Sequence, residues 1–278
     1  MALSTRFQEA DMSTIPSASN RPSAPNGRDA ALPANHERAW SPWEGIVGAS
    51  LLAIAAALLL LPTTPLQAQD PSVAVEEGGI FVAGWEGRID AQEAERGFSL
   101  DDARLAEEGG ALRVTTGPAT IYWHETAVGT GQYTVSAEFT EHEYMALNNH
   151  PHPYGIFIAG NEMGTSEQRF VYCSAYGNGT FIVRGFGPEP FRLNGPRPEP
   201  HPAVNQAADQ GEPVTQHIAM TVGDGTLSCA INGTVVAEFE LSEVVGEGQL
   251  STTDGVWGVR FGHNTDATVA DLQGPMRE

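Results

Sequence analysis

Hydrophobic and polar residues alternate along residues 133–144 with a period of two. Four apolar side chains would point to one face of an extended segment: Tyr133, Val135, Ala137 and Phe139. The intervening side chains, most of them polar, would point to the other face: Ser136, Glu138, Thr140, His142 and Tyr144. Successive side chains of a β-strand point to opposite faces, so this period is typical of a strand. The segment is therefore predicted to have one face in the core and one polar face.

The same alternation predicts the buried faces of three later strands. The side chains expected to point inward are Ile218, Met220 and Val222, then Leu227, Cys229 and Ile231, and finally Trp257, Val259 and Phe261. Arg260 lies between two of these positions and is expected on the opposite face. Sheets with one apolar face must bury that face against a second layer.

From Gly79 onward, short runs rich in Val, Ile, Phe, Tyr and Thr are separated by Gly, Asn, Asp or Pro. Three joints carry pairs that accept the backbone of tight hairpin turns: Asn178-Gly179, Asp224-Gly225 and Asn232-Gly233. Only two short helices are expected, at Leu100–Glu107 and Leu241–Val245. About a dozen strands with so little helix predict an all-β fold, a two-sheet antiparallel sandwich over residues 79–273.

The first 69 residues differ in composition from the rest. Residues 1–43 are rich in Ser, Pro, Asn and Ala, and Ile46–Leu61 follows as 16 uncharged residues. The segment "TTPLQAQD" then offers small residues for signal-peptide cleavage near Ala68. The apolar run is shorter than the roughly 20 residues that span a bilayer, but an uncleaved anchor stays open. We expect a leader at 1–69, a single exported β domain at 70–278, and a secreted, periplasmic or cell-surface location.

The charge balance excludes some classes of partner. All 14 basic residues are arginines, and 35 acidic residues give a formal net charge of −21. Such a chain repels phosphate backbones and anionic lipid headgroups, which bind through Lys and Arg. Nucleic acid is therefore excluded, and contact with a membrane is expected only through the N-terminal anchor. A glycan, a small sugar or a cation remains compatible as a partner.

The two cysteines lie in separate strand-like runs, Cys173 in "QRFVYCSAY" and Cys229 in "GTLSCAING". In an oxidising compartment they could form a disulfide worth roughly 3 to 4 kcal/mol. Two buried free thiols, common in β cores, are the alternative. The sequence leaves both open.

Several segments occur in an order that points to a known fold: "GWEGRID", "GGALRVTT", "GQYTVSAEF", "PYGIFIAG", "QRFVYCSAYGNG", "CAINGTVV" and "GVWGVRFGHNTDATVADL". Together they resemble the concanavalin A-like jelly roll of the 3-keto-disaccharide hydrolase (DUF1080) type, over most of residues 80–273. The resemblance implies a secreted, carbohydrate-directed protein. It implies either a glycoside hydrolase or lyase, or a non-catalytic lectin-like module, because a fold shared so widely does not specify a reaction.

The richest chemical segment is "FTEHEYMALNNHPHPYG". Glu138 and His142, on the polar face of their strand, are the candidate acid–base residues. His150 and His152, two apart in an extended loop, are candidate ligands for a divalent metal such as zinc or calcium. His263 and Asp266, in "HNTD", are weaker candidates at the end of a strand.

Tyr172, Tyr176 and Arg184 are the candidate ligand-binding residues, because aromatic rings stack on sugars and an arginine can orient hydroxyl groups. We expect their strands to extend the sheet that carries Glu138 and His142. The Pro-rich insertion at residues 188–213 is expected to cover that face as a lid. The sequence thus predicts one site where the polar face, the histidine loop and the insertion meet.

Overall fold

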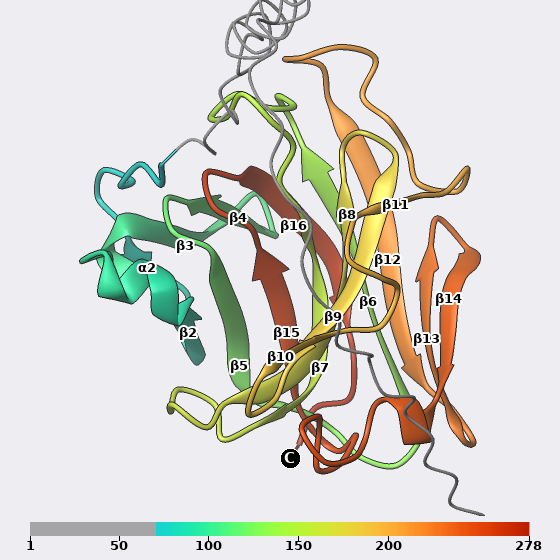
Figure 1. Cartoon of the computed structure of the whole chain (residues 1–278). Helices are drawn as coiled ribbons and strands as arrows, with labels where there is room; N and C mark the ends of the chain where they lie inside the picture. Colours follow the sequence, from blue (N-terminus) through green and yellow to red (C-terminus); the bar gives the residue numbers. More distant parts are fainter. Residues whose placement is uncertain (1–70, 278) are drawn as a thin grey trace, which may run out of the picture. The chain divides into compact units, whose positions relative to one another are not determined.

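The computed structural model describes residues 71–277, and its strands form two sheets (Figure 1). Sheet A has the order β1-β3-β4-β16-β6-β12-β13-β14. Its strands are β1 Gly79–Ile80, β3 Ala103–Glu108, β4 Ala111–Thr116, β16 Asp266–Gln273, β6 Tyr133–Glu141, β12 Val214–Val222, β13 Thr226–Ile231 and β14 Thr234–Glu240. Sheet B has the order β10-β9-β8-β7-β15-β5-β2, and β11 also pairs with β9. Its strands are β10 Pro190–Arg192, β9 Thr180–Phe186, β8 Arg169–Tyr176, β7 Tyr154–Asn161, β15 Gly255–Phe261, β5 Thr120–Gly129, β2 Trp85–Ile89 and β11 Glu199–Pro200.

The predicted all-β antiparallel sandwich is confirmed. Within residues 71–277, every pairing of named strands is antiparallel except β1 with β3. Helical structure in this range is limited to α2 (Ala91–Glu95) and two short 3-10 turns, Leu100–Asp102 and Leu241–Glu243. At the hairpin between β13 and β14, Asn232 and Gly233 both adopt positive φ, as a type I′ turn requires.

The main core lies between the two sheets and contains the side chains that alternation selected. The buried residues of this cluster include Val135, Phe139, Ile218, Met220, Leu227, Ile231, Tyr154, Ile156, Val171, Trp257, Val259 and Phe261. They come from strands of both sheets, so each sheet buries one face against the other. The predicted inward faces of β6, β12, β13 and β15 are confirmed.

One predicted helix is wrong over most of its length. Of Leu100–Glu107, only the first three residues are helical, and β3 begins at Ala103. Ser99 caps the short turn, because its hydroxyl accepts a hydrogen bond from the Asp101 backbone amide at 3.2 Å. Ala103 and Leu105 then alternate into the core while β3 pairs with β4. The burial of alternate side chains in a paired strand therefore outweighs the helix propensity of this segment.

Cys173 and Cys229 form a disulfide, with their Cα atoms 6.2 Å apart. Cys173 lies in β8 of sheet B and Cys229 in β13 of sheet A, so the bond joins the two layers across the core. Of the two alternatives that the sequence left open, the structure contains the bridge.

The Pro-rich insertion at 188–213 is partly built into sheet B. Its short strands β10 and β11 both pair with β9. Phe191 packs against the main core, and the His201 ring meets Phe181 edge-on at a centroid distance of 6.2 Å. Two residues of the predicted lid, Phe191 and His201, therefore contact the sandwich itself.

Sheet B carries a second apolar cluster that is separate from the main core. Its buried members are Ile121, Trp123, Phe157, Phe170, Tyr172 and Ile182. Arg260 lies beside it, at 5.6 Å from the ring centre of Tyr172 and 5.8 Å from that of Phe186. Both Arg260 end nitrogens donate to the Asp90 carboxylate, at 2.7 and 2.6 Å. The predicted position of Arg260 opposite the core is confirmed, although the side chain is buried rather than solvated.

The leader expected at residues 1–69, with its cleavage site or anchor, lies outside the described residues. Within 71–277, no helix is both long enough and apolar enough to cross a membrane.

Candidate functional site

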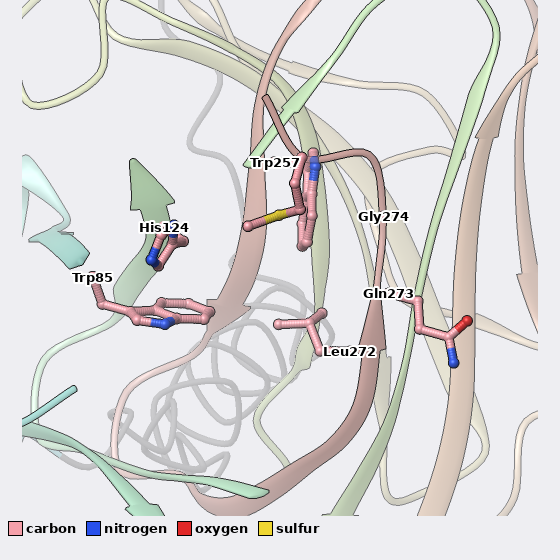
Figure 2. A pocket seen from close by; sticks show the side chains of 7 residues that line it. Trp85, His124, Trp257, Leu272, Gln273 and Gly274 are labelled. Carbon is pink, nitrogen blue, oxygen red and sulfur yellow. The ribbon is translucent and has the colours of Figure 1, made fainter. Parts of the chain in front are cut away.

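A pocket of about 390 Å³ opens at the edge of the sandwich where β2, β5 and β15 of sheet B approach the end of β16 (Figure 2). Its lining residues are Trp85, His124, Trp257, Leu272, Gln273, Gly274 and Met276. Figure 2 shows the rings of Trp85, His124 and Trp257 around a common space, with Leu272 beside them and the Gln273 amide directed away from the rings. The volume lies at the low end of the roughly 300–1,000 Å³ range of small-molecule pockets.

Trp85 and His124 form one wall of the pocket. Trp85 begins the edge strand β2 and is the register partner of His124 in β5, and their rings meet edge-on at 6.2 Å. His124 Nδ1 accepts a hydrogen bond from the Thr126 backbone amide at 3.3 Å. Since Nδ1 is the acceptor, the neutral ring carries its proton on Nε2. The wall therefore combines an indole with an imidazole donor.

Trp257 forms the opposite wall. The pairing of β15 with both neighbouring strands shifts register between Val256 and Gly258, and such irregularities redirect side chains. The Trp257 indole nitrogen donates to the Pro275 carbonyl at 2.7 Å, which fixes the ring. A Cβ on Gly274 would come within 2.7 Å of the indole, so only glycine lets the chain pass this close to the ring.

The C-terminal segment completes the lining of the pocket. It runs beside the irregular part of β5, where Ala127 pairs with Met276 and the Arg277 amide donates to the Thr126 carbonyl at 2.7 Å. Met276 is 52% exposed although it is apolar. Chain segments from both ends of the domain thus meet at one pocket that has two indoles, an imidazole, a leucine and a thioether.

Glu138 and His142 lie on the outer face of sheet A, exposed as the alternation predicted. They are four residues apart along an extended chain, which separates them by roughly 13 Å. The register partner of Glu138 is His217 in β12, and His142 Nε2 contacts the Thr268 hydroxyl at 2.7 Å. The two side chains therefore do not form a contacting acid–base pair, and their catalytic role stays a prediction.

Tyr172, Tyr176 and Arg184 do not extend the sheet of Glu138 and His142, so this expectation is wrong. Their strands, β8 and β9, belong to sheet B. Strands adjacent in sequence can lie in either layer of a sandwich, and the alternation within each strand does not specify which layer. The three residues do lie together, because Tyr172 pairs with Arg184 and Tyr176 lies further along the same strand.

The surroundings of Tyr172 favour packing over ligand contact. It is 6% exposed, its ring is stacked near Phe186 with a centroid distance of 6.2 Å, and burial raises its pKa. Tyr176 is half-buried, and burial raises its pKa to about 12. Arg184 donates to the Pro196 carbonyl at 3.5 Å. Tyr172 thus packs within the second apolar cluster and does not line the pocket described above.

His150 and His152 do lie together, and His263 joins them. One ring nitrogen from each of the three residues lies within 4.8 Å of the others. The ring of His152 is 4.3 Å from that of His150 and 3.8 Å from that of His263, measured between centroids. Burial, together with the neighbouring histidines, lowers the pKa of His152 to about 3, so its ring is neutral near pH 7. Both predicted metal ligands thus belong to a three-histidine cluster, and their role as ligands stays a prediction.

Glu141, at the end of β6, is a buried carboxyl group. It belongs to the segment "FTEHEYMALNNHPHPYG", but the predicted acid–base residues were its neighbours Glu138 and His142. One of its oxygens accepts a hydrogen bond from the Met145 amide at 3.0 Å, and the other is buried without a partner among the described residues. Burial raises the pKa of Glu141 to about 7. The hydrogen bond from the Met145 amide acts in the opposite direction, and the charge of Asp266 raises the pKa further. The inward parity of position 141, after Phe139, was the signal available in the sequence.

We expect Glu141 to make the domain less stable as pH rises. Unfolded glutamate releases its proton near pH 4.5, whereas the folded protein retains it up to about pH 7, so folding binds a proton between these values. The contribution of Glu141 to the free energy of unfolding should therefore fall by up to about 3 kcal/mol over this interval. His152, whose pKa is lowered on folding, acts in the opposite direction below about pH 6.5. Urea denaturation of the parent and of Glu141→Gln, each at pH 5 and pH 8, isolates the Glu141 contribution, because that of His152 is present in both proteins. Identical pH dependence in the variant and the parent would contradict this assignment.

No family model matches the chain, and no curated protein matches it either. Solved structures do show similarity to parts of the chain. A carbohydrate-binding module, CBM66 from Bacillus subtilis, is 6% identical, with a TM-score of 0.46 over 71% of this chain and 98% of that one. A B. subtilis protein of unknown function with a galectin-like fold is 14% identical, with a TM-score of 0.46 over 76% and 100% of the two chains. Sheep galectin-11 is 10% identical, with a TM-score of 0.36 over 54% of this chain and 95% of that one.

Proposed function

We propose that this domain binds a neutral sugar residue in the pocket between Trp85 and Trp257, without catalysing a reaction on it. One observation carries the proposal: two indoles from different strands, one of them half-buried and one fixed by a hydrogen bond, line a pocket of about 390 Å³. The C–H faces of a sugar ring are apolar and pack on aromatic rings, while its hydroxyl groups need a few donors and acceptors at the rim.

The composition of the pocket favours binding over hydrolysis. Glycoside hydrolysis usually requires two carboxyl groups beside the scissile bond. Of the seven described residues that line this pocket, none carries a carboxylate. The imidazole of His124 is the one titratable group among them. The lining is therefore suited to holding a ring rather than to protonating a leaving group.

The charge of the chain selects among sugars. With a formal net charge of −21, the protein repels sulfated, sialylated or uronic acid glycans over distances up to the Debye length. A neutral sugar is not affected by this repulsion. We therefore assign the pocket to neutral glycans, and together with the predicted leader we propose that the domain meets them outside the cytoplasm.

A glycoside hydrolase or lyase of the 3-keto-disaccharide type is the second candidate function. The cluster of His150, His152 and His263 favours it, since imidazoles supply acid–base groups or metal ligands. Incubation of the purified protein with neutral disaccharides and their 3-keto derivatives, followed by chromatography of the products, separates the two candidates. We expect the disaccharides to be recovered intact.

Replacement of Trp85 tests the pocket directly. Trp85 begins an edge strand and is only half-buried, so Trp85→Ala should leave the fold intact while it removes one stacking surface. We expect Trp85→Ala to weaken binding of the best neutral ligand from a glycan array by about 10- to 30-fold, the loss typical of a central aromatic contact. Titration followed by tryptophan fluorescence or calorimetry measures it.

Phe81→Ala is the matched control, because Phe81 is an aromatic residue that is 58% exposed and does not line the pocket. Phe81→Ala should bind the sugar as tightly as the parent protein does. Trp85→Phe, which keeps an aromatic ring, should bind it more tightly than Trp85→Ala does. Equal affinities of Trp85→Ala and the parent protein would place the sugar elsewhere. Stronger binding of anionic than of neutral glycans would contradict the charge argument.

A further inference from the structure

The sequence around His150 and His152 explains why their side chains converge. Each is followed by proline, in "HPHP", and a residue before proline is restricted to extended backbone conformations. Side chains two apart in an extended chain point to the same side. The segment leads directly into β7, so the rigid scaffold of sheet B positions both rings.

His263 reaches the same place from the end of β15, the strand that pairs with β7. Directly after the last pair of that ladder, Tyr154 with Phe261, the Gly262 amide donates to the Pro153 carbonyl at 2.7 Å. A Cβ on Gly262 would lie 2.7 Å from the Pro153 ring and 3.2 Å from the His152 Cβ. Glycine at this position therefore allows the close approach that brings His263 to the other two rings.

Hydrogen bonds fix the loop that carries His263. The neighbouring Asn264 is buried, and its side chain accepts from the Val73 amide at 2.8 Å and donates to the Pro71 carbonyl at 3.0 Å. The Asn148 side chain donates to the Asn264 carbonyl at 2.6 Å, which ties the histidine loop to this one. A cluster held from several sides in this way is preorganised.

The ring nitrogens of His150 and His152 have the tautomer and position of metal ligands. His150 Nδ1 lies 2.9 Å from the Asn149 side-chain oxygen, which can only accept, so Nδ1 carries the proton and Nε2 the lone pair. His150 Nε2 and His152 Nε2 are both buried without a hydrogen-bond partner among residues 71–277. A hydrogen bond that fixes the tautomer of a ligating histidine through its other nitrogen is typical of metal centres.

We propose that His150, His152 and His263 bind one divalent transition metal ion, with zinc as the best match. Three imidazoles and an open fourth position, filled by water or by a ligand atom, form a known zinc arrangement. Tetrahedral zinc with bonds of about 2.0–2.1 Å places its ligand atoms ~3.3 Å apart, so small side-chain rotations bring nitrogens within 4.8 Å onto one ion. Calcium, which prefers oxygen ligands, does not match three imidazoles.

The proposal does not rest on sugar binding. Trp257 and His263 are six residues apart across β15, which separates the zinc cluster from the sugar pocket by roughly 20 Å. His150 and His263 are half-buried, so the ion is reachable from solvent.

Calorimetric titration tests the proposal on the full chain, freed of any affinity tag and treated with a chelator. We expect zinc chloride to bind at one ion per chain, and metal analysis after dialysis to find the same ratio. Loss of even an outer-shell partner weakens metal binding about 10- to 100-fold, so loss of a ligand in His150→Ala or His263→Ala should weaken it at least about 100-fold. His217→Ala, which removes an exposed histidine on sheet A, is the control and should bind zinc as the parent does.

Histidine-ring NMR of the unsubstituted protein keeps the test valid if a variant fails to fold. Zinc should shift the ring signals of three histidines and leave that of His217 unchanged. Absence of stoichiometric binding, unaltered affinity in both ligand variants, or shifts at other histidines would overturn the proposal. Binding of calcium in preference to zinc would do the same.

Discussion

Loss of the Cys173–Cys229 disulfide is expected to lower the free energy of unfolding by about 4 kcal/mol. The bond closes a loop over a sequence separation of 56 residues and joins the two sheets. In the chain-entropy model, a loop of that length restricts the unfolded chain by about this amount. For a domain of this size the melting temperature should fall by roughly 8 to 16 °C.

Reduction under denaturing conditions, followed by refolding with reductant and calorimetry, measures the effect. The double variant Cys173→Ala/Cys229→Ala serves as the control, because reductant should not change its melting temperature further. If reduced and oxidised protein melt at the same temperature, the bridge does not stabilise the sandwich.

The second large effect is expected at the ion pair between Asp90 and Arg260. The two partners differ in exposure, since the Arg260 side chain is 8% exposed and that of Asp90 is 31% exposed. Removing one partner of a buried pair leaves an uncompensated charge and costs about 3–5 kcal/mol. Asp90→Ala leaves the buried Arg260 guanidinium without an opposite charge, whereas Arg260→Met leaves the Asp90 carboxylate partly exposed to water. We therefore expect Asp90→Ala to be the more destabilising substitution.

Chemical denaturation of the two single variants and the double variant checks this order. Asp90→Ala/Arg260→Met leaves no unpaired charge in this place, and the new methionine side chain packs against Tyr172 and Phe186. The double variant should therefore be more stable than Asp90→Ala alone. A larger loss in Arg260→Met than in Asp90→Ala would show that the contacts of Arg260 with the rings outweigh its pairing.

The sequence was sufficient for the faces of the strands. Alternation in residues 133–141 separated core from surface because side chains of a strand point to opposite faces regardless of which strand lies next to it. The same rule placed Arg260 opposite the core but did not predict its burial. That burial depends on Asp90, 170 residues away, and on the aromatic cluster of sheet B.

Assignment of strands to sheets was beyond the sequence. Tyr172 and Arg184 were expected beside Glu138, but β8 and β9 pair in the other layer. The layer of a strand is set by long-range pairing, which no local pattern encodes. The residues expected in one site thus lie apart, with Glu138 and His142 on the outer face of sheet A and Tyr172 and Arg184 in sheet B.

The pocket between Trp85 and Trp257 was not predicted from the sequence. Trp85 and Trp257 are far apart along the chain, and Trp257 was correctly expected in the core, where it also packs. The pocket forms because irregular pairing of β15 and the C-terminal segment bring them together. The histidine cluster was partly predictable, because "HPHP" is local, whereas the approach of His263 depends on the pairing of β7 with β15.

Indole NMR of the protein during titration with a neutral sugar tests the central claim most directly. Trp85 and Trp257 line the pocket, while Trp123 belongs to the separate cluster on sheet B and serves as an internal reference. With signals assigned by single Trp→Phe variants, the indole N–H resonances of Trp85 and Trp257 should shift together along one saturation curve, and that of Trp123 should not move. A saturable shift of Trp123 alone, or saturable sugar binding with no change at Trp85 and Trp257, would contradict the assignment of the pocket.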